Sequence, residues 1–386
     1  MSVDSRPVSS RVLFGVFTFL LGLAVLLGLT LPPGATAWII DPPTSPVFNV
    51  DNNSDNPVLN LCTDADPEDC SLRGALLVIS LYPNTFPLYT INIPAGLGPN
   101  EPLGTILLTN GQLEIFTNVK IVGPGADQLT IDAQDNSRVF YVYAAPVKEA
   151  GILQDSEHGN ADISGLTMTY GGDVYMGGGI LVEGGQATLT NCMVTFNSAV
   201  KGGGAAVDAN GSLTISGGTI SFNSACLEGG GIYAGGAPDT LTLTNAAIMN
   251  NTAGWSGGGV FVRDSTANLT GCTITDNEAM YSGGGVTAYY GTANIVNCTI
   301  TGNQVTGEMA SGGGGIRVYY GTLTLQDSTL FGNTSTHDGG GISLYGVPGL
   351  DGITTALKEN TALEDDVPKT LTLTNTTIMN NTALGY

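Results

Sequence analysis

Positively charged residues are scarce in this sequence. The 386 residues include 11 lysines and arginines but 33 aspartates and glutamates, which gives a formal net charge of −22. A surface this acidic repels nucleic acid and anionic membranes. The composition therefore argues against nucleic acid as a partner. We expect membrane contact only through an uncleaved N-terminal segment or a C-terminal anchor missing from the sequence.

The repeated part of the chain also lacks any helical pattern of apolar residues. In its place, three glycines followed by an apolar-x-apolar triplet occur seven times, and 56 residues of the chain are glycine. The third glycines of the seven copies fall at positions 179, 204, 231, 259, 285, 315 and 341. These positions are 25 to 30 residues apart, and a period of this size predicts a solenoid.

Two further apolar patterns recur in each repeat. One is a short alternating run, such as Ala187 to Asn191, and the other places an apolar residue three positions before an asparagine. The asparagines of this column are Asn197, Asn223, Asn251, Asn277, Asn303, Asn333 and Asn381. Alternation predicts strands with one buried face. Three short strands in about 26 residues, with no room for a crossover helix, predict an all-β fold: one coil of a single-stranded parallel β-helix, with the asparagines forming a ladder between coils.

The N-terminal residues differ from the rest in their hydropathy. Arg6 and Arg11 precede an apolar, uncharged run from Val12 to Leu31, and Ala35-Thr36-Ala37 is a small-x-small cleavage site. This pattern predicts a signal peptide over residues 1–37. The apolar run is also long enough to span a bilayer, so an uncleaved anchor is the alternative.

The remainder divides into three expected regions. Residues 38–60 are rich in Pro, Asn and Asp and are expected to be an exposed leader, and residues 61–102 are expected to form an N-terminal cap. In that cap, Ser71 is the expected N-cap of a short helix that covers the first coil. The β-helix is assigned to residues 103–386, and we expect it to be truncated because the sequence stops where another glycine triplet is due.

The six cysteines give two questions about disulfides, which export would permit. Cys62 and Cys70 bracket a short acidic loop and can pair. Cys192, Cys272 and Cys298 share a column with small residues in the other coils, which favours a packing stack. Cys272 and Cys298 are one coil apart and near enough to bridge, but the column explains them without a bond.

The segment Cys70-Ser71-Leu72-Arg73-Gly74-Ala75 resembles the CSLREA motif of exported bacterial proteins, with Gly74 in place of the usual Glu. The repeats are similar to those of pectin-lyase-like right-handed parallel β-helix proteins and of polymorphic outer-membrane proteins. The resemblance extends over residues 62–386. Together with the general rule for parallel crossovers, it implies a right-handed coil, and it implies a secreted or cell-surface protein.

The resemblance also directs attention to polysaccharide lyases and polygalacturonases, which share the fold. Their carboxylate, histidine and Arg-x-Lys signatures do not occur here, and the only histidines are His158 and His337. Glu183 and Asp208 are expected to be outward carboxylates one coil apart, a spacing that would suit an acid/base pair or calcium, although a solvated face is the preferred interpretation. We therefore assign no catalytic residue and no metal site.

A weaker signal for calcium is the acidic loop before Cys70. Its carboxylates are Asp64, Asp66, Glu68 and Asp69, and the loop lacks the glycine and the distal glutamate of an EF-hand. We expect no cofactor, with calcium as the one alternative.

Aromatic residues are expected on the outer face of the strand that follows each glycine triplet. The candidate ligand-binding residues of this face are Tyr233, Phe261, Tyr289, Arg317, Tyr319 and Tyr345. Aromatics on a flat parallel sheet would form a platform for sugar rings or another chain. Stacking between coils would favour the same residues for purely structural reasons.

These observations favour a non-catalytic extracellular or cell-surface protein. The expected role is that of an adhesin-like or carbohydrate-contacting scaffold, with a polysaccharide or another surface protein as its partner. The alternative is a polysaccharide lyase or glycoside hydrolase with an atypical active site. Two insertions, 143–160 and 346–369, interrupt the repeats, and such loops often carry function in solenoids.

Overall fold

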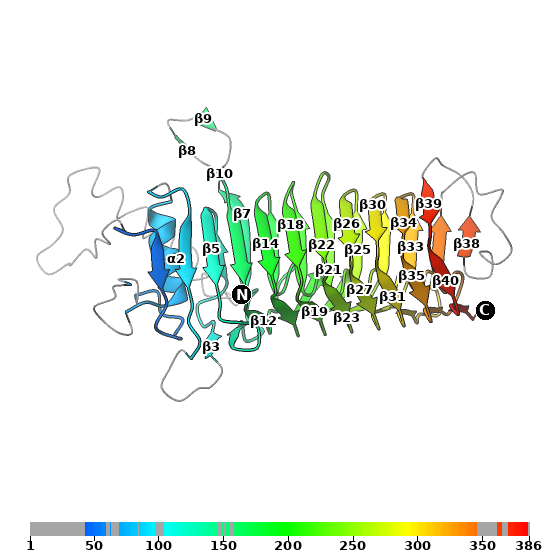
Figure 1. The fold of residues 1–386 in the computed structure, drawn as a ribbon, viewed down its shortest axis with the longest axis horizontal. Helices are drawn as coiled ribbons and strands as arrows, with labels where there is room; N and C mark the ends of the chain where they lie inside the picture. The colour runs from blue at the N-terminus through cyan, green and yellow to red at the C-terminus, as the bar shows by residue number, and fades with distance from the viewer. Residues whose placement is uncertain are drawn as a thin grey trace, which may run out of the picture. The chain divides into compact units, whose positions relative to one another are not determined.

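The computed structural model describes residues 43–58, 62, 69–83, 85–96, 104–145, 148–149, 152–153, 157–345, 361–364 and 370–384. Residues from 42 onward form one compact unit. In that unit the chain winds as a right-handed parallel β-helix whose coils stack strand on strand (Figure 1). The predicted fold class is confirmed. The predicted signal peptide lies outside the described residues.

Sheet I contains the strands that follow the glycine triplets, together with their equivalents in the early and last coils. Its parallel strands are β4 (Leu113–Ile115), β7 (Phe140–Ala145), β13 (Ile180–Glu183), β17 (Ala205–Asp208), β21 (Ile232–Gly235), β25 (Val260–Arg263), β29 (Val286–Tyr289), β33 (Ile316–Tyr319), β37 (Ile342–Tyr345) and β38 (Thr361–Glu364). A short strand, β10 (Glu157–His158), pairs antiparallel with β7.

Sheet II comes next in each coil. Its strands are β1 (Val47–Asn49), β2 (Tyr89–Asn92), β5 (Asn118–Val122), β11 (Asn160–Ser164), β14 (Gln186–Thr190), β18 (Ser212–Ser216), β22 (Thr240–Thr244), β26 (Thr266–Thr270), β30 (Thr292–Val296), β34 (Thr322–Gln326) and β39 (Leu371–Thr374). Residues 38–60 were expected to be an exposed leader, but their described part contributes β1, in which Phe48 is buried. The leader prediction is therefore wrong for these residues, because sheet II gives them a strand edge to pair with.

Sheet III precedes the asparagine column. Its strands are β3 (Gly104–Leu107), β6 (Leu129–Asp132), β12 (Thr167–Thr169), β15 (Met193–Thr195), β19 (Thr219–Ser221), β23 (Ala247–Met249), β27 (Thr273–Thr275), β31 (Thr299–Thr301), β35 (Thr329–Phe331) and β40 (Thr377–Met379). A separate hairpin pairs β8 (Lys148–Glu149) with β9 (Ile152–Leu153).

A fourth strand, which the sequence patterns did not predict, follows the asparagine in the regular coils. Sheet IV contains β16 (Ser198–Lys201), β20 (Ser224–Glu228), β24 (Thr252–Ala253), β28 (Glu278–Ala279), β32 (Gln304–Val305), β36 (Thr334–Ser335) and β41 (Thr382–Ala383). Most of these strands have two residues, which is too short for an alternating pattern to be visible in the sequence.

The asparagine ladder is formed as predicted. Asn277 is fully buried, and its Oδ1 accepts hydrogen bonds from the Nδ2 of Asn251 at 2.9 Å and from the backbone N–H of Asn251 at 3.0 Å. Its own Nδ2 donates to the Oδ1 of Asn303 and to the carbonyl of Ile248, both at 2.9 Å. An amide of this ladder therefore hydrogen-bonds to backbone groups of the preceding coil as well as to the neighbouring asparagines of the column.

The N-terminal helix α2 (Leu72–Leu81) lies at the N-terminal end of the coils, as predicted (Figure 1). It packs against β2 and β4. The side chain of Ser71 accepts a hydrogen bond from the backbone N–H of Gly74 at 2.9 Å, as an N-cap does. Cys70 is disulfide-bonded to Cys62. Within the described parts of the chain, no helix has both the length and the apolar character needed to cross a bilayer.

Arg73 connects this helix to the first coils. Its guanidinium donates to Oδ1 of the buried Asp55 at 2.5 Å, to the carbonyl of Gln112 at 3.0 Å and to the carbonyl of Gly111. The other oxygen of Asp55 accepts from the backbone N–H groups of Thr109 and Asn110. The segment that resembles the CSLREA motif thus holds the N-terminal cap to the first coils of the solenoid through the contacts of Arg73.

The cysteine column also agrees with the packing interpretation. Cys192, Cys272 and Cys298 are buried free thiols. Cys272 and Cys298 are in contact without a bond, and the Sγ of Cys298 accepts a hydrogen bond from the backbone N–H of Cys272 at 3.2 Å.

Candidate functional site

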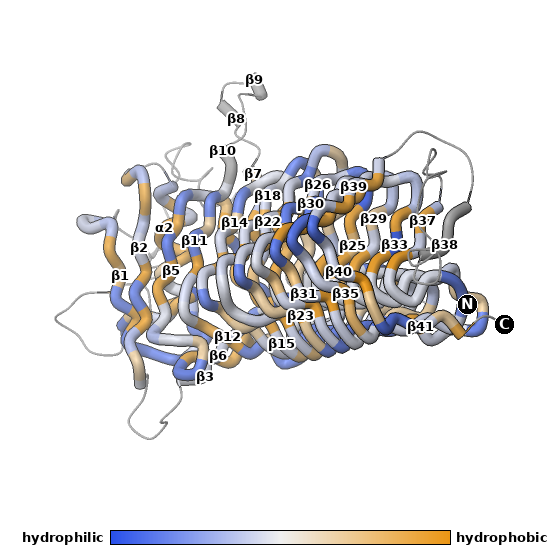
Figure 2. Tube along the Cα trace, turned by 45° about the vertical axis from the view of Figure 1, so that its right-hand side comes forward, coloured by the Kyte–Doolittle hydropathy of each residue, from blue (hydrophilic) through white to orange (hydrophobic). Residues whose placement is uncertain are grey.

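The middle residue of each sheet I strand was expected to point into solvent, and the structure shows that it is covered. Tyr233, Phe261 and Arg317 are only 2–3% exposed. The chain passes over this position as it enters the glycine triplet that precedes the same strand: Gly257 has φ +69°, and a Cβ there would lie 2.7 Å from the Cβ of Phe261. The prediction that these three residues lie on the outer surface is therefore wrong. Figure 2 shows the apolar residues recurring in this sheet from β25 to β37.

The covered column forms a small second core outside the coil. Tyr233 and Phe261 stack with their ring centroids 5.7 Å apart, and they pack with Leu181 and Ala206. Arg317 donates to the carbonyl of Ser311 at 2.7 Å and to the hydroxyl of Ser343. These contacts give the three buried residues a structural role.

The two cations at the edge of this core share one carboxylate. Glu228 lies 3.1 Å from Nζ of Lys201 and 2.6 Å from the guanidinium of Arg263. Arg263 also lies 5.0 Å above the ring of Tyr289 and 5.4 Å above that of Phe261. This edge of sheet I therefore offers paired cations, which are poorly suited to binding an anionic ligand.

The last residues of three neighbouring strands form the partly exposed portion of the predicted aromatic face. Tyr289, Tyr319 and Tyr345 stack with centroids 4.8 Å apart at each step. Tyr290 and Tyr320 form a second row 5.2 Å apart, and their rings are roughly perpendicular to those of the first row. We call these five residues the tyrosine face.

The rings of this face are turned edge outward. Because neighbouring rings in each row are nearly parallel, at 4° and 6° in the first row, their faces cover one another and their edges and hydroxyls meet solvent. A hydrogen bond with Tyr345 raises the pKa of Tyr320 to about 12, so this hydroxyl stays neutral. The structure thus replaces the expected flat platform with a ridge of phenol edges and hydroxyl groups.

Tyr290 and Tyr320 were not among the predicted site residues, and their backbone makes them the most informative ones. Their φ angles are +53° and +48°, in the left-handed region. Earlier coils have Gly184, Ala209 and Asp264 at this position. A bulky residue there costs about 1 kcal/mol or more, and burial does not explain it, because Tyr290 is 45% exposed. The glycine in the same column was the signal that could have identified this pair.

An acidic group lies on the same edge of sheet I, nearer the N-terminus. Glu183 and Asp208 are in register on β13 and β17, as expected for carboxylates one coil apart. The hydroxyl of Tyr141 donates to Glu183, and burial together with this contact raises the pKa of Tyr141. Burial also raises the pKa of Asp208.

Asp239 is the buried member of this acidic group. It is 1% exposed, its Oδ1 accepts from the backbone N–H of Gly211 at 3.0 Å, and its Oδ2 has no hydrogen-bond partner among the described residues. Burial, and to a lesser extent the charge of Asp208, raises the pKa of Asp239 from 3.8 to about 6. Its burial keeps it from reaching a polymeric substrate.

We predict that Asp239 makes the protein less stable as the pH rises from about 4 to about 6. In this window the native state retains a proton that the unfolded chain has lost, so stability is highest below the unfolded pKa and is lost through the folded pKa of about 6. The expected loss is about 2–3 kcal/mol. Urea denaturation from pH 4 to 7 measures it, and Asp239→Asn should flatten the dependence. The exposed Asp264→Asn, one coil away, should keep it; equal slopes in all three proteins would contradict the assignment.

Of the remaining candidates, His337 lies in a turn and most of the others lie outside the described residues. The backbone N–H of His337 donates to the Ser335 hydroxyl, and its Nδ1 lies 3.3 Å from the hydroxyl of Thr336, as in a turn. The side chain of His158 and residues 64, 66 and 68 of the acidic loop lie outside the described residues, as does most of the 346–369 insertion. Across the part of the chain that is described, no three His, Cys, Asp or Glu side chains are placed to hold a metal ion.

Comparison with known proteins identifies the family. A family model described as "right handed beta helix region" matches residues 104–362, which is more than half of the chain. Searches of curated proteins and of solved structures gave no match. The matched residues contain the regular coils and the tyrosine face described above. The chain therefore belongs to the right-handed β-helix family.

Proposed function

We propose that the protein is a non-catalytic, exported scaffold whose tyrosine face binds a neutral polysaccharide. The observation that carries the proposal is the pair Tyr290 and Tyr320, which hold an exposed and a partly exposed ring in left-handed backbone that neighbouring coils give to glycine, alanine or aspartate. Backbone strain at exposed positions is typical of functional sites, and the hydroxyl groups distinguish these two residues from Phe196 and Phe222, which are also exposed and left-handed. Phenol hydroxyls and ring edges can donate to and pack against a chain of sugars.

The charges around the face indicate which polysaccharide it takes. Lys201 and Arg263 are both engaged by Glu228, and the protein carries a formal net charge of −22. An acidic polymer would be repelled by a surface of this charge, and the described cations at this edge of sheet I, Lys201 and Arg263, already contact a carboxylate. The proposal is therefore restricted to neutral glycans.

An extracellular or cell-surface location and an adhesin-like role form part of the proposal. The signal-like pattern of residues 1–37 supports export, as does the disulfide between Cys62 and Cys70, a bond typical of oxidising compartments. The resemblance of residues 70–75 to the CSLREA motif is in line with a bacterial exported protein.

The proposal predicts binding without cleavage. Affinity electrophoresis of the purified protein in gels that contain a neutral glucan, a galactomannan, polygalacturonate or alginate would measure retention, and reducing-end assays on the same mixtures would measure cleavage. We expect retention by at least one neutral polymer and no new chain ends. Retention by the acidic polymers alone would contradict the proposed ligand class. Cleavage products would favour the lyase or hydrolase alternative and direct attention to Glu183 and Asp208.

A further inference from the structure

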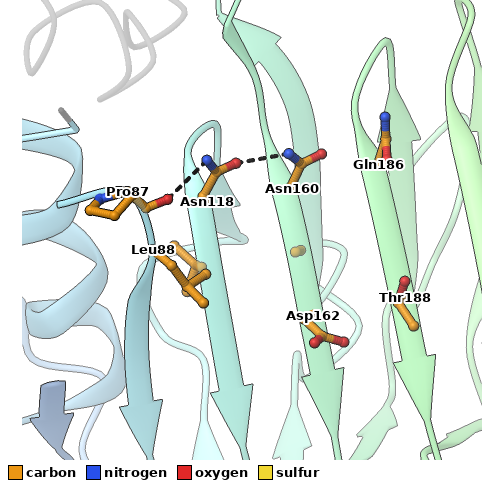
Figure 3. A pocket seen from close by; sticks show the side chains of 9 residues that line it. Pro87, Leu88, Asn118, Asn160, Asp162, Gln186 and Thr188 are labelled. Carbon is orange, nitrogen blue, oxygen red and sulfur yellow. Dashed lines mark hydrogen bonds between the residues drawn. The ribbon is translucent and has the colours of Figure 1, made fainter. Parts of the chain in front are cut away.

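A second candidate site lies on sheet II, on a different strand set from the tyrosine face. A shallow pocket of about 340 Å³ is lined by the outer faces of β5, β11 and β14 and by Pro87 and Leu88 (Figure 3). Its floor is the buried layer of Val119 and Ala161. Neither the aromatic pattern nor the acidic residues drew attention to it in the sequence.

Four polar side chains lie at the solvent side of this pocket, and they occupy the corners of a rectangle on the sheet. Asn160 and Gln186 are in register on neighbouring strands, and so are Asp162 and Thr188 (Figure 3). Neighbouring strands lie about 4.8 Å apart, and same-face residues along one strand lie about 6.6 Å apart. These dimensions match a six-membered sugar ring with its hydroxyl groups.

Two consecutive amide hydrogen bonds set the orientation of the Asn160 side chain at one corner of this rectangle. The Nδ2 of Asn118 donates to the carbonyl of Pro87 at 3.1 Å, and the Nδ2 of Asn160 donates to the Oδ1 of Asn118 at 2.8 Å. This orientation leaves the Oδ1 of Asn160 as an acceptor at the next coil, where Gln186 stands (Figure 3). A side chain whose orientation is set before binding loses little freedom when a ligand arrives.

The balance of donors and acceptors selects the ligand. Asp162 is an acceptor only, Asn160 presents an acceptor, and Thr188 and Gln186 can both donate and accept. A ligand must therefore bring several hydrogen-bond donors. A carboxylate in the pocket would meet Asp162 with like charge, since the exposed Lys120, which is in register with Asp162 on β5, does not line the pocket. Leu88, which is 47% exposed, and Pro87 add an apolar wall, and pockets that combine such a wall with a few convergent polar groups are typical of small-ligand sites.

We propose that this pocket binds one neutral sugar unit through Asn160, Asp162, Gln186 and Thr188, with the ring against Pro87 and Leu88. The site is independent of the tyrosine face, since it lies on another sheet. It would hold a single residue of a glycan, whereas the tyrosine face would contact a longer stretch.

Saturation-transfer NMR on the full chain tests the proposal with six free sugars. The probes are glucose, galactose, mannose and N-acetylglucosamine, together with glucuronate and galacturonate as acidic counterparts, each titrated to about 10 mM, where millimolar affinities are measurable. We expect at least one neutral sugar to bind, and its uronate, where tested, to bind at least about tenfold more weakly, equivalent to the loss of one hydrogen bond. Absence of binding by every neutral sugar, or equal binding of the uronates, would overturn the proposal.

Variants locate the bound sugar. Asn160→Ala should weaken binding by about tenfold. Asn294→Ala is the matched control, because Asn294 makes the same kind of amide bond, to Oδ1 of Asn268 at 2.9 Å, farther along the same sheet; its binding should equal that of the wild type. The double variant Tyr290→Asn/Tyr320→Asn should also bind normally, which separates this site from the tyrosine face. Equal affinity of Asn160→Ala and the wild type would refute the assignment.

Discussion

Replacing Asn277 with aspartate is expected to lower the free energy of unfolding by about 3–6 kcal/mol, although the two side chains have nearly the same shape. The substitution removes the Nδ2 donor that serves the carbonyl of Ile248 and the Oδ1 of Asn303. Each buried acceptor left without a donor costs about 1–3 kcal/mol, and the new carboxylate is buried in the ladder. The two bonds received from Asn251 would be kept, so the effect reports the lost donors and the buried charge.

Chemical denaturation followed by circular dichroism measures this loss. The control is Asn294→Asp on the outer side of the following coil, where the amide is only partly buried, and it should cost less than about 1 kcal/mol. Part of the Asn277→Asp loss should be recovered in acid, because a protonated carboxyl regains one donor. Similar stability of the two variants at neutral pH would show that the ladder is not a major source of stability.

Arg73→Ala is expected to release the N-terminal cap, at a cost of about 3–5 kcal/mol to that region. The change leaves the buried carboxylate of Asp55 without its cation, and breaking one half of a buried ion pair typically costs this much. It also leaves the carbonyls of Gly111 and Gln112 without their donors. Arg73→Lys should rescue little, because a single ammonium cannot reach all three acceptors as the planar guanidinium does.

Hydrogen exchange localises this effect, since a solenoid can open at one end without global unfolding. Amides of β1, β2 and α2 should exchange faster in Arg73→Ala, while those of the central coils keep their protection. Lys120→Ala, which removes an exposed cation from sheet II, is the control and should match the wild type. Unchanged exchange in the cap of Arg73→Ala would contradict the role assigned to the motif.

The features predicted correctly were those encoded by local periodicity. The strands of sheets I, II and III follow from alternation, and the ladder follows from one asparagine per repeat. The N-cap of α2 follows from Ser71 and the apolar residues after it. Each depends on residues a few positions apart, with stacking then placing equivalent residues in columns.

The burial of Tyr233, Phe261 and Arg317 could not be predicted in the same way. It depends on the path of the chain before each glycine triplet, which passes over the middle of the strand that follows. One sign was available: β13 reads Ile-Leu-Val without a polar residue between, and a continuous apolar run is typical of strands buried on both faces. The triplet's first glycine is there because the chain needs φ > 0 and space at that crossing.

The pocket on sheet II could not be predicted from the sequence either. Gln186 lies one regular repeat after Asn160, but Asn118 and Asn160 come from neighbouring coils that are separated by an insertion of irregular length. Their register is set by sheet pairing across that insertion. Only the structure brings these amides and the Pro87 carbonyl together.

Tyr290 and Tyr320 are proposed to serve binding rather than stability. Asparagine suits left-handed backbone better than tyrosine does, so Tyr290→Asn/Tyr320→Asn should change the free energy of unfolding by no more than about 1 kcal/mol, the strain relieved offsetting the stacking lost. A matched control is Phe196→Asn/Phe222→Asn. These two phenylalanines are also stacked, 51% exposed and left-handed, at 5.2 Å between centroids, but they lie in the turn between sheets III and IV and carry no hydroxyl.

The most direct measurement compares the wild type and these two double variants by affinity electrophoresis. The gel contains the neutral polysaccharide that the wild type binds, and thermal melting is recorded on the same samples. The account predicts that the tyrosine variant loses at least tenfold in affinity with little change in melting, while the phenylalanine variant keeps wild-type retention. Wild-type retention by the tyrosine variant would contradict the account and leave the tyrosine face as a structural stack.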